Sequence, residues 1–318
     1  MNIVLLLLGF AGLILGGEWL VRGAVSIAHK FNVSPMLIGL TLVGFGTSTP
    51  ELVTSVQAAM VGSPGIAVGN VVGSNIANIL LILGVAALVL PIAVSRNAFK
   101  RDGSMLVFAT LLCVAVVVMG SLSRPVGSLL LVFLFLYLGS TIYLERKHKS
   151  PAGDVYDAEA ESIDAAPLSM PKSAGLLIGG LLATIIGAKL LVGAAVSMAT
   201  AWGISEAVIG LTIVSIGTSM PELVTSVIAA RKGQSDVAFG NVVGSNLFNI
   251  LGILGVTALV KPLQVPATII SFDIWVMLVA TALLILVAMT GWRITRREGA
   301  LLILGYAGYI LYQLVTLA

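Results

Sequence analysis

Long apolar runs alternate along the chain with short polar or charged connections. A run of about 20 apolar residues is long enough to cross the hydrocarbon core of a bilayer as an α-helix. The pattern predicts ten such helices, at approximately 3–28, 36–60, 65–91, 103–121, 125–144, 174–200, 206–230, 236–260, 267–290 and 299–317. We therefore expect an all-α polytopic membrane protein.

The apolar pattern contains an internal repeat. GLTLVGFGTSTPELVTSV at 39–56 returns as GLTIVSIGTSMPELVTSV at 210–227, with 14 of 18 positions identical. GNVVGSNIANILLILG at 69–84 returns at 240–255, with 13 of 16 identical. Because both segments return after the same shift along the chain, a whole half was duplicated. The predicted organisation is a first five-helix repeat at 1–145 (core 39–84), a linker at 146–173 and a second five-helix repeat at 174–318 (core 210–255).

An odd number of spans per half predicts that the two repeats are inverted in the membrane relative to each other. The charges of the connections agree with this topology. Thirteen Lys and Arg residues fall on one side, whereas the other side has only Arg124 and Lys261. The positive-inside rule assigns the thirteen to the cytoplasm. We therefore expect both termini outside and the linker 146–173 in the cytoplasm.

The composition excludes several classes of function. Hydrophobic residues make up 58% of the 318 and charged residues 10%, and the net charge of +3 is a topology signal that does not point to nucleic-acid binding. The lone Cys113 permits neither an internal disulfide nor a cysteine metal site. HExxH, GxSxG and paired intramembrane aspartates are missing from the sequence, so we do not expect an enzyme.

Two acidic residues, Glu51 and Glu222, stand inside otherwise apolar or small-residue runs, each directly after a proline. A charged residue in the middle of a membrane helix costs roughly 2.5–3.5 kcal/mol on insertion scales and normally marks an ion or substrate pathway. Because the two glutamates occupy matched positions in the repeat, we expect them to converge on one cation.

The prolines should open the helix beside these carboxylates. Pro50 lacks an N–H, so the carbonyl of Gly46 loses its helical hydrogen bond, and Pro221 frees Gly217 in the same way. In hydrocarbon such a carbonyl is tolerated where it lines a cavity or meets a ligand. Hydroxyl groups lie one turn before the glutamates, at Thr47, Ser48, Thr218 and Ser219.

The second repeated segment adds neutral oxygen atoms. Its polar side chains lie four residues apart and so share a helix face, at Ser74 and Asn78 and again at Ser245 and Asn249. Single Ser and Asn residues in membrane helices commonly hydrogen-bond one helix to another. Their duplication beside two glutamates favours ion ligation instead.

An all-oxygen set without Cys or His selects Ca²⁺, Na⁺ or Mg²⁺. Two glutamates neutralise one Ca²⁺. Without it, two facing carboxylates must hold monovalent cations or take up protons, because two bare anions are disfavoured in a low dielectric. This predicts exchange, since the site crosses the membrane more easily when loaded than when empty.

Outside this core, few residues of the spans are charged. Glu18 and Arg22 are four apart and should pair on one helix face. Asp273 lies near the start of the ninth span, close to the outer interface, where we expect it to be solvated. Glycines give the first and sixth spans smooth faces that could slide past neighbouring helices, at 9, 12, 16, 17 and 23 and at 175, 179, 180, 187 and 193.

GTSTPE, GTSMPE and the two copies of GNVVGSN resemble the alpha repeats of the calcium/cation antiporter superfamily, most closely the prokaryotic sodium/calcium exchangers. The resemblance covers nearly the whole chain and implies Na⁺-driven Ca²⁺ extrusion across a prokaryotic plasma (inner) membrane, with the first and sixth spans as the sliding pair. It implies Glu51 and Glu222 as shared ligands of both ions. It further implies oxygen ligands at Thr47, Ser48, Thr218, Ser219, Ser74, Ser245, Asn78 and Asn249, and sodium-site carbonyls at Gly44 and Ser215.

The implied partners are Ca²⁺, Na⁺ and the lipid bilayer. We expect no cofactor, and a chain that functions as a monomer. Some relatives, including potassium-dependent ones, carry an aspartate at the position of Asn249, so the amide argues against a K⁺ requirement.

Two other transport functions stay open. A Ca²⁺/H⁺ antiporter of the same superfamily is the nearer alternative, although protons need no cage of hydroxyls and carbonyls. A passive cation channel would need a continuous pore, usually formed by a ring of subunits, which inverted repeats in one chain do not suggest.

Overall fold

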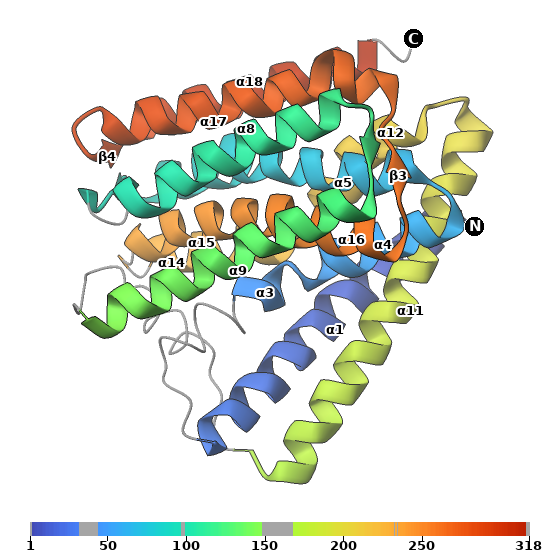
Figure 1. Cartoon of the computed structure of the whole chain (residues 1–318), viewed down its shortest axis with the longest axis horizontal. Helices are drawn as coiled ribbons and strands as arrows, with labels where there is room; N and C mark the ends of the chain where they lie inside the picture. Colours follow the sequence, from blue (N-terminus) through green and yellow to red (C-terminus); the bar gives the residue numbers. More distant parts are fainter. Residues whose placement is uncertain are drawn as a thin grey trace.

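The structure is a computed structural model of the chain, in which the described residues form a helical bundle (Figure 1). It describes residues 2–31, 44–96, 99–147, 168–231, 233 and 235–315. Most of the predicted linker 146–173, and the start of the predicted core 39–84, lie outside these residues.

In the first half, the α-helices are α1 (Asn2–Lys30), α3 (Gly44–Thr47), α4 (Thr49–Val61), α5 (Pro64–Ala77), α6 (Leu83–Val89), α8 (Ser104–Val118) and α9 (Arg124–Lys147). The π-helical turn η2 (Asn78–Ile82) joins α5 to α6, and η3 (Phe99–Gly103) leads into α8. Gly62 ends α4 with φ 85°, a left-handed conformation that glycine adopts without strain. Pro64 then begins α5, where its missing N–H leaves no helical bond unmade.

In the second half, the α-helices are α11 (Met170–Trp202), α12 (Glu206–Ile209), α13 (Ser215–Thr218), α14 (Met220–Arg231), α15 (Ser235–Leu247), α16 (Leu254–Val260), α17 (Ile274–Met289) and α18 (Arg296–Val315). The π-helical turns are η4 (Gly210–Val214), η5 (Phe248–Ile253) and η6 (Ile269–Asp273). The turns η2 and η5 fall at the same place in the two repeats, at Asn78 and Asn249. Such π-turns are frequent at functional sites.

Within the described residues, eight helices are long and apolar enough to cross a membrane, and a ninth span results if α12 to α14 count as one bent segment. The predicted span 36–60 is described only from Gly44 onward, as α3 and α4. The helical, multi-span architecture is therefore confirmed. The count of ten and the inverted orientation of the repeats stay predictions.

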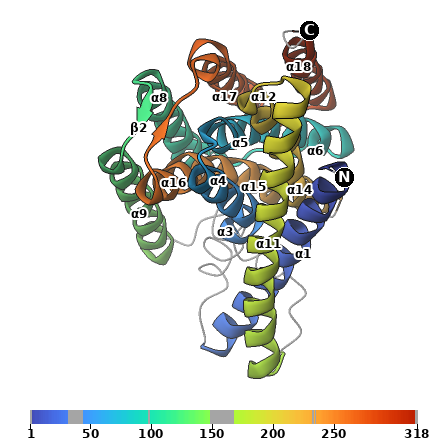
Figure 2. The same ribbon diagram turned by 90° about the vertical axis from the view of Figure 1, so that its right-hand side faces the viewer.

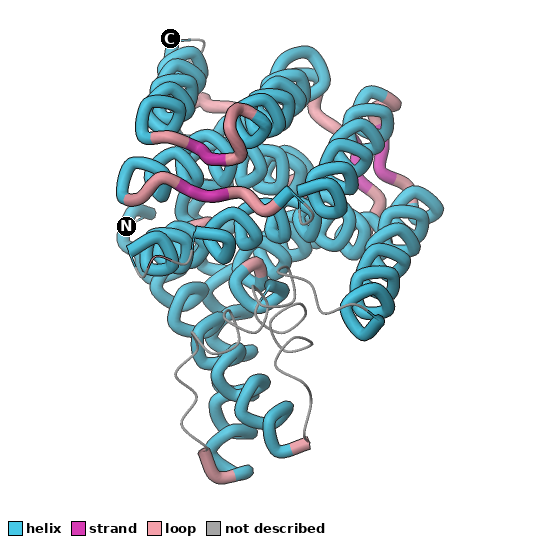
Figure 3. Tube along the Cα trace, turned by 90° about the vertical axis from the view of Figure 1, so that its left-hand side faces the viewer, coloured by secondary structure: helices cyan, strands magenta, loops and turns pink. Residues whose placement is uncertain are grey.

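Short antiparallel strand pairs tie the two halves together at two points (Figure 3). β1 (Ile92–Ala93) pairs with β4 (Arg293–Ile294). β2 (Ser121–Leu122) pairs with β3 (Leu263–Gln264). β1 and β3 begin at equivalent positions of the two repeats. Each of these two equivalent strands pairs with a strand of the opposite half.

The repeated segments occupy the centre of the protein. In the most apolar stretch of each span, 83% of Pro64–Val89 and 78% of Val237–Val260 is buried inside the protein. The corresponding share for Asn2–Ala28 is 28%. Spans that are buried on all sides can carry polar groups away from lipid, which is where a membrane protein places a site.

Helices α1 and α11 lie side by side and extend beyond the other helices (Figures 1 and 2). Glycines allow this close contact. A Cβ atom built at Gly9 would lie 2.7 Å from the backbone nitrogen of Leu191, and one at Gly16 would lie 2.6 Å from that of Thr184. Gly180 and Gly187 face the backbone of α1 in the same way. The expected smooth faces are confirmed at these positions, whereas Gly175, Gly179 and Gly193 face open space among the described residues.

Asp273 is buried, so the prediction that it is solvated was wrong. Only 2% of this residue is exposed, and its carboxylate accepts hydrogen bonds from Tyr309 Oη at 2.9 Å and from Gln313 Nε2. Tyr309 and Gln313 of α18 contact this carboxylate at the end of η6, whereas its position near the start of a span had suggested that it was solvated. The predicted pair of Glu18 and Arg22 forms, with an N–O distance of 2.7 Å.

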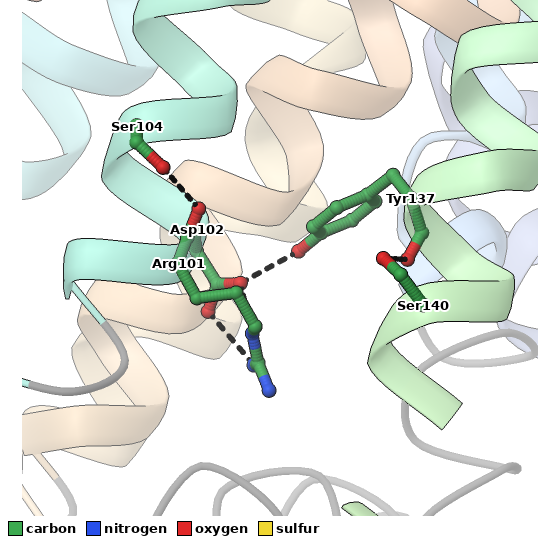
Figure 4. A network of polar contacts seen from close by, with 5 residues as sticks. All are labelled: Arg101, Asp102, Ser104, Tyr137 and Ser140. Atoms are coloured by element: carbon green, nitrogen blue, oxygen red, sulfur yellow. Dashed lines mark hydrogen bonds and ion pairs between the residues drawn. The ribbon is translucent and has the colours of Figure 1, made fainter. Parts of the chain in front are cut away.

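The counterpart of Asp273 in the first repeat is Asp102. Tyr137 Oη points toward Asp102 Oδ1 and donates a hydrogen bond at 3.0 Å (Figure 4). Here the partner is a cation, because Arg101 Nε lies 2.6 Å from the same oxygen. Asp102 therefore connects the fourth span to the fifth by a hydrogen bond, and Asp273 connects the ninth span to the tenth in the same way.

We expect Tyr309→Phe to lower the melting temperature of the detergent-solubilised protein. The change removes a donor from a buried carboxylate, and a hydrogen bond to a charged group contributes roughly 1.5–3 kcal/mol. The control is Tyr143→Phe, because 64% of Tyr143 is exposed. Equal melting temperatures for the two variants would show that the bond to Asp273 does not stabilise the fold.

Candidate functional site

The predicted breaks occur at the same position in both halves. α3 ends at Thr47 and α4 begins at Thr49, with Ser48 between them at φ −88° and ψ 7°. α13 ends at Thr218 and α14 begins at Met220, with Ser219 at φ −83° and ψ 9°. The second break bends the segment by 44°. Pro50 and Pro221 account for the breaks, since neither can donate the next helical hydrogen bond.

The breaks bring the two glutamates into a shared network. Glu51 and Glu222 are each only 1% exposed. Ser219 Oγ donates to Glu51 Oε1 at 2.8 Å, and Ser48 Oγ donates to Glu222 Oε1 at 2.9 Å. Each half thus supplies the serine that holds the carboxylate of the other half.

Several buried oxygen atoms of the predicted site have no hydrogen-bond partner among the described residues. Glu51 and Glu222 each have one carboxylate oxygen, Oε2, in this state. The same is true of four oxygen atoms of the other predicted ligands, namely Ser74 Oγ, Ser245 Oγ, Asn78 Oδ1 and Asn249 Oδ1. A buried polar atom without a partner is costly, so a set of this kind suits a ligand that binds oxygen.

The negative charge of the site also favours a bound cation. Among the described residues, the ion pairs Glu18–Arg22 and Arg101–Asp102 include neither Glu51 nor Glu222. Buried carboxylates are stable when paired with a cation or neutralised by protons. Carboxylate, hydroxyl and amide oxygens are the ligands that Ca²⁺ and Na⁺ accept.

The remaining predicted residues have mixed positions. Thr218 is buried, Thr47 is partly buried, and Gly44 begins α3. The hydroxyl of Ser215 donates to the carbonyl of Leu211 at 2.7 Å. The Ser215 carbonyl itself accepts from Ser219 N at 3.1 Å and Thr218 Oγ1 at 3.3 Å, so a sodium ion would have to replace one of these bonds.

Two asparagines that the sequence analysis did not single out hold the glutamates in place. Asn70 Nδ2 donates to the Glu51 carbonyl at 3.2 Å and to Ser55 Oγ at 3.0 Å. Asn241 makes the matching bonds to the Glu222 carbonyl at 3.3 Å and to Ser226 Oγ at 2.9 Å. The available signal was that all six residues are identical in the two copies of the repeat.

The chain is similar to known membrane antiporters. The family described as "Sodium/calcium exchanger protein" matches the chain over residues 1–143 and 172–315. The chain is 40% identical over 309 residues to the putative antiporter CaxA of Alkalimonas amylolytica, with 96% of both proteins covered. It is 34% identical over 301 residues to the inner membrane protein YrbG of Escherichia coli strain K12, covering 93% of this chain and 90% of YrbG.

A solved structure has the same fold. It is the sodium-calcium exchanger NCX_Mj soaked with 2.5 mM Na⁺ and 0.1 mM Ca²⁺, which matches with a TM-score of 0.65 and 35% sequence identity, covering 98% of this chain and 97% of that chain. The predicted resemblance is confirmed by both the sequence and the structure comparisons. The chain therefore belongs to the sodium/calcium exchanger family of multi-pass integral membrane proteins.

Proposed function

We propose that the chain is a secondary active antiporter that exchanges Ca²⁺ for Na⁺ by alternating access, with Glu51 and Glu222 as ligands shared by both ions. The observation that carries this proposal is the reciprocal arrangement of the two carboxylates. Each is buried, each is held at one oxygen by a serine of the opposite half, and each has its second oxygen free for an ion.

The site has the charge that exchange requires. Two carboxylates balance one Ca²⁺, and after its release they hold Na⁺ or protons, because two bare carboxylates are disfavoured in a low dielectric. The free hydroxyl and amide oxygens favour Na⁺, since a proton binds one oxygen and needs no cage. We therefore assign Na⁺ as the coupling ion and keep H⁺ as the alternative for the experiment to decide.

Helix α1 can couple ion binding to access. A Cβ atom added at Gly46 would overlap the side chain of Val21, and one at Gly217 would overlap the ring of Phe10. One face of α1 thus covers both helix breaks, while glycines join the helix to α11. Movement of α1 and α11 together along the site would open it first to one side of the membrane and then to the other.

We further propose ten spans in two inverted repeats, with both termini outside and the linker 146–173 in the cytoplasm of a prokaryotic plasma (inner) membrane. Two observations support a two-fold relation between the halves. Each strand pair contains one strand from each half, and each half donates a serine hydrogen bond to the glutamate of the other half. The thirteen positive residues on one side support the orientation.

The test is Ca²⁺ uptake into proteoliposomes. Purified protein is reconstituted in Na⁺-loaded vesicles, which are diluted into Na⁺-free buffer that contains Ca²⁺. We expect uptake that requires the outward Na⁺ gradient and persists when a protonophore abolishes any pH gradient. Uptake that follows an imposed pH gradient and ignores Na⁺ would identify a Ca²⁺/H⁺ antiporter instead.

Asn249→Asp should change the response to monovalent ions. Both polar atoms of the Asn249 amide are buried and have no hydrogen-bond partner within the described ranges, so a carboxylate there would add a third charge to the site. We expect the Na⁺ concentration for half-maximal exchange to shift about tenfold, which corresponds to about 1.4 kcal/mol. Na⁺ and K⁺ titrations of uptake measure the shift. An unchanged profile would place Asn249 outside the ion path.

A further inference from the structure

Among the described residues, the two halves differ in the contacts of their repeated asparagines. Asn78 Nδ2 donates to Asn246 Oδ1 at 3.0 Å, and both residues are fully buried. The bond related to it by the repeat would run from Asn249 to Asn75. Asn75 Nδ2 instead donates to the carbonyl of Val71 at 2.8 Å, and both amide atoms of Asn249 lack a hydrogen-bond partner in the part of the chain that the structure describes.

This contact fixes the direction of an ion ligand. An amide whose nitrogen is held by a hydrogen bond cannot rotate freely, so the oxygen of Asn78 keeps one direction. That oxygen, Oδ1, is buried without a partner and is the atom that a cation would bind. Outer partners of this kind orient metal ligands, and their loss weakens binding even though they do not touch the ion.

The residues that precede these asparagines do not account for the difference, because GNVVGSN is identical in both halves. The two residues that follow do differ, since Ile76 and Ala77 stand where the second half has Leu247 and Phe248. The two copies of the motif therefore make different amide contacts in this conformation.

We propose that Asn246 is a positioning residue for Asn78 in this conformation, and that Asn75 takes the same role for Asn249 in the opposite-facing one. The inference rests on the proposed exchange function, in which inverted halves swap their conformations during transport. In each state one asparagine pair is bonded and the other is open. The hydrogen bond between asparagine side chains thus alternates between the two pairs as the site opens to one side of the membrane and then to the other.

The experiment compares Asn246→Leu with Asn75→Leu, since leucine has a similar size and neither donates nor accepts. Na⁺-driven Ca²⁺ transport is measured in right-side-out and inside-out membrane vesicles, which gives the KM for Ca²⁺ at each face. We expect each variant to raise the KM about tenfold at one face, and the two variants to affect opposite faces. Equal increases at both faces, or no increase at either face, would overturn the proposal.

A double-mutant cycle keeps the proposal testable if leucine is not tolerated at Asn246. Asn246→Ala should raise the KM in the wild-type background and add nothing in an Asn78→Ala background, because it acts through the Asn78 amide. Additive effects would show that Asn246 acts independently of Asn78 and would refute the positioning role. Wild-type vesicles separate the two proposals: if they do not exchange, the proposed function fails, whereas exchange without the predicted pattern refutes only this inference.

Discussion

Glu222→Gln and Glu51→Gln should each reduce Na⁺-driven Ca²⁺ uptake to the level of protein-free vesicles. Glutamine keeps the shape of glutamate and can still accept the hydrogen bond from Ser48 or Ser219. It removes one of the two charges that would balance Ca²⁺ in the proposed site. Loss of one partner from a buried charge pair costs roughly 3–5 kcal/mol. Since about 1.4 kcal/mol corresponds to a tenfold change in affinity, Ca²⁺ binding should weaken by a factor of roughly a hundred or more.

The matched control is Glu18→Gln, which removes an acidic residue from a membrane helix outside the site. Glu18 is about half exposed and pairs with Arg22, and exposed pairs contribute about 0–1 kcal/mol. We expect this variant to transport Ca²⁺ at a rate close to wild type. Melting temperatures establish that all the variants fold. Wild-type uptake in Glu51→Gln or Glu222→Gln would remove that glutamate from the ion site.

The helix breaks and the buried glutamates of the candidate site were predictable from sequence because their causes are local. Proline lacks an N–H wherever it occurs, so Pro50 and Pro221 predict the helix breaks without knowledge of the fold. A buried carboxylate needs a partner, and the repeat places Glu51 and Glu222 at matched positions. These arguments also brought in the hydroxyls of Ser48 and Ser219, which the structure joins to the glutamates of the opposite half.

The supporting contacts were not predictable because they form between distant parts of the chain. Ser219 and Glu51 are 168 residues apart, and Ser48 and Glu222 are 174 apart. Sequence spacing cannot show which helix faces which at that range. The amide contacts of Asn70 and Asn241 depend on the same packing. Asp273 was misjudged for this reason, since its burial comes from Tyr309 and Gln313 on a later helix.

The contact between α1 and α11 is the second place where a small change should have a large effect. Gly180 and Gly179 are adjacent on α11 but face different surroundings. A methyl group at Gly180 would overlap the backbone of α1 near Leu20, whereas no atom of the described residues lies within 4 Å of one at Gly179. The backbone of α1 cannot rotate away as a side chain could, so the two helices must separate.

We therefore expect Gly180→Ala to slow Na⁺-driven Ca²⁺ uptake at least tenfold, while Gly179→Ala transports at a rate close to wild type. Overpacking of a close contact costs roughly 1–3 kcal/mol, enough to displace α1 from the helix breaks that it covers at Gly46 and Gly217. Initial uptake rates and melting temperatures of both variants provide the measurement. Because the variants add the same methyl group to adjacent residues, equal rates would show that close packing of α1 on α11 does not control access to the site.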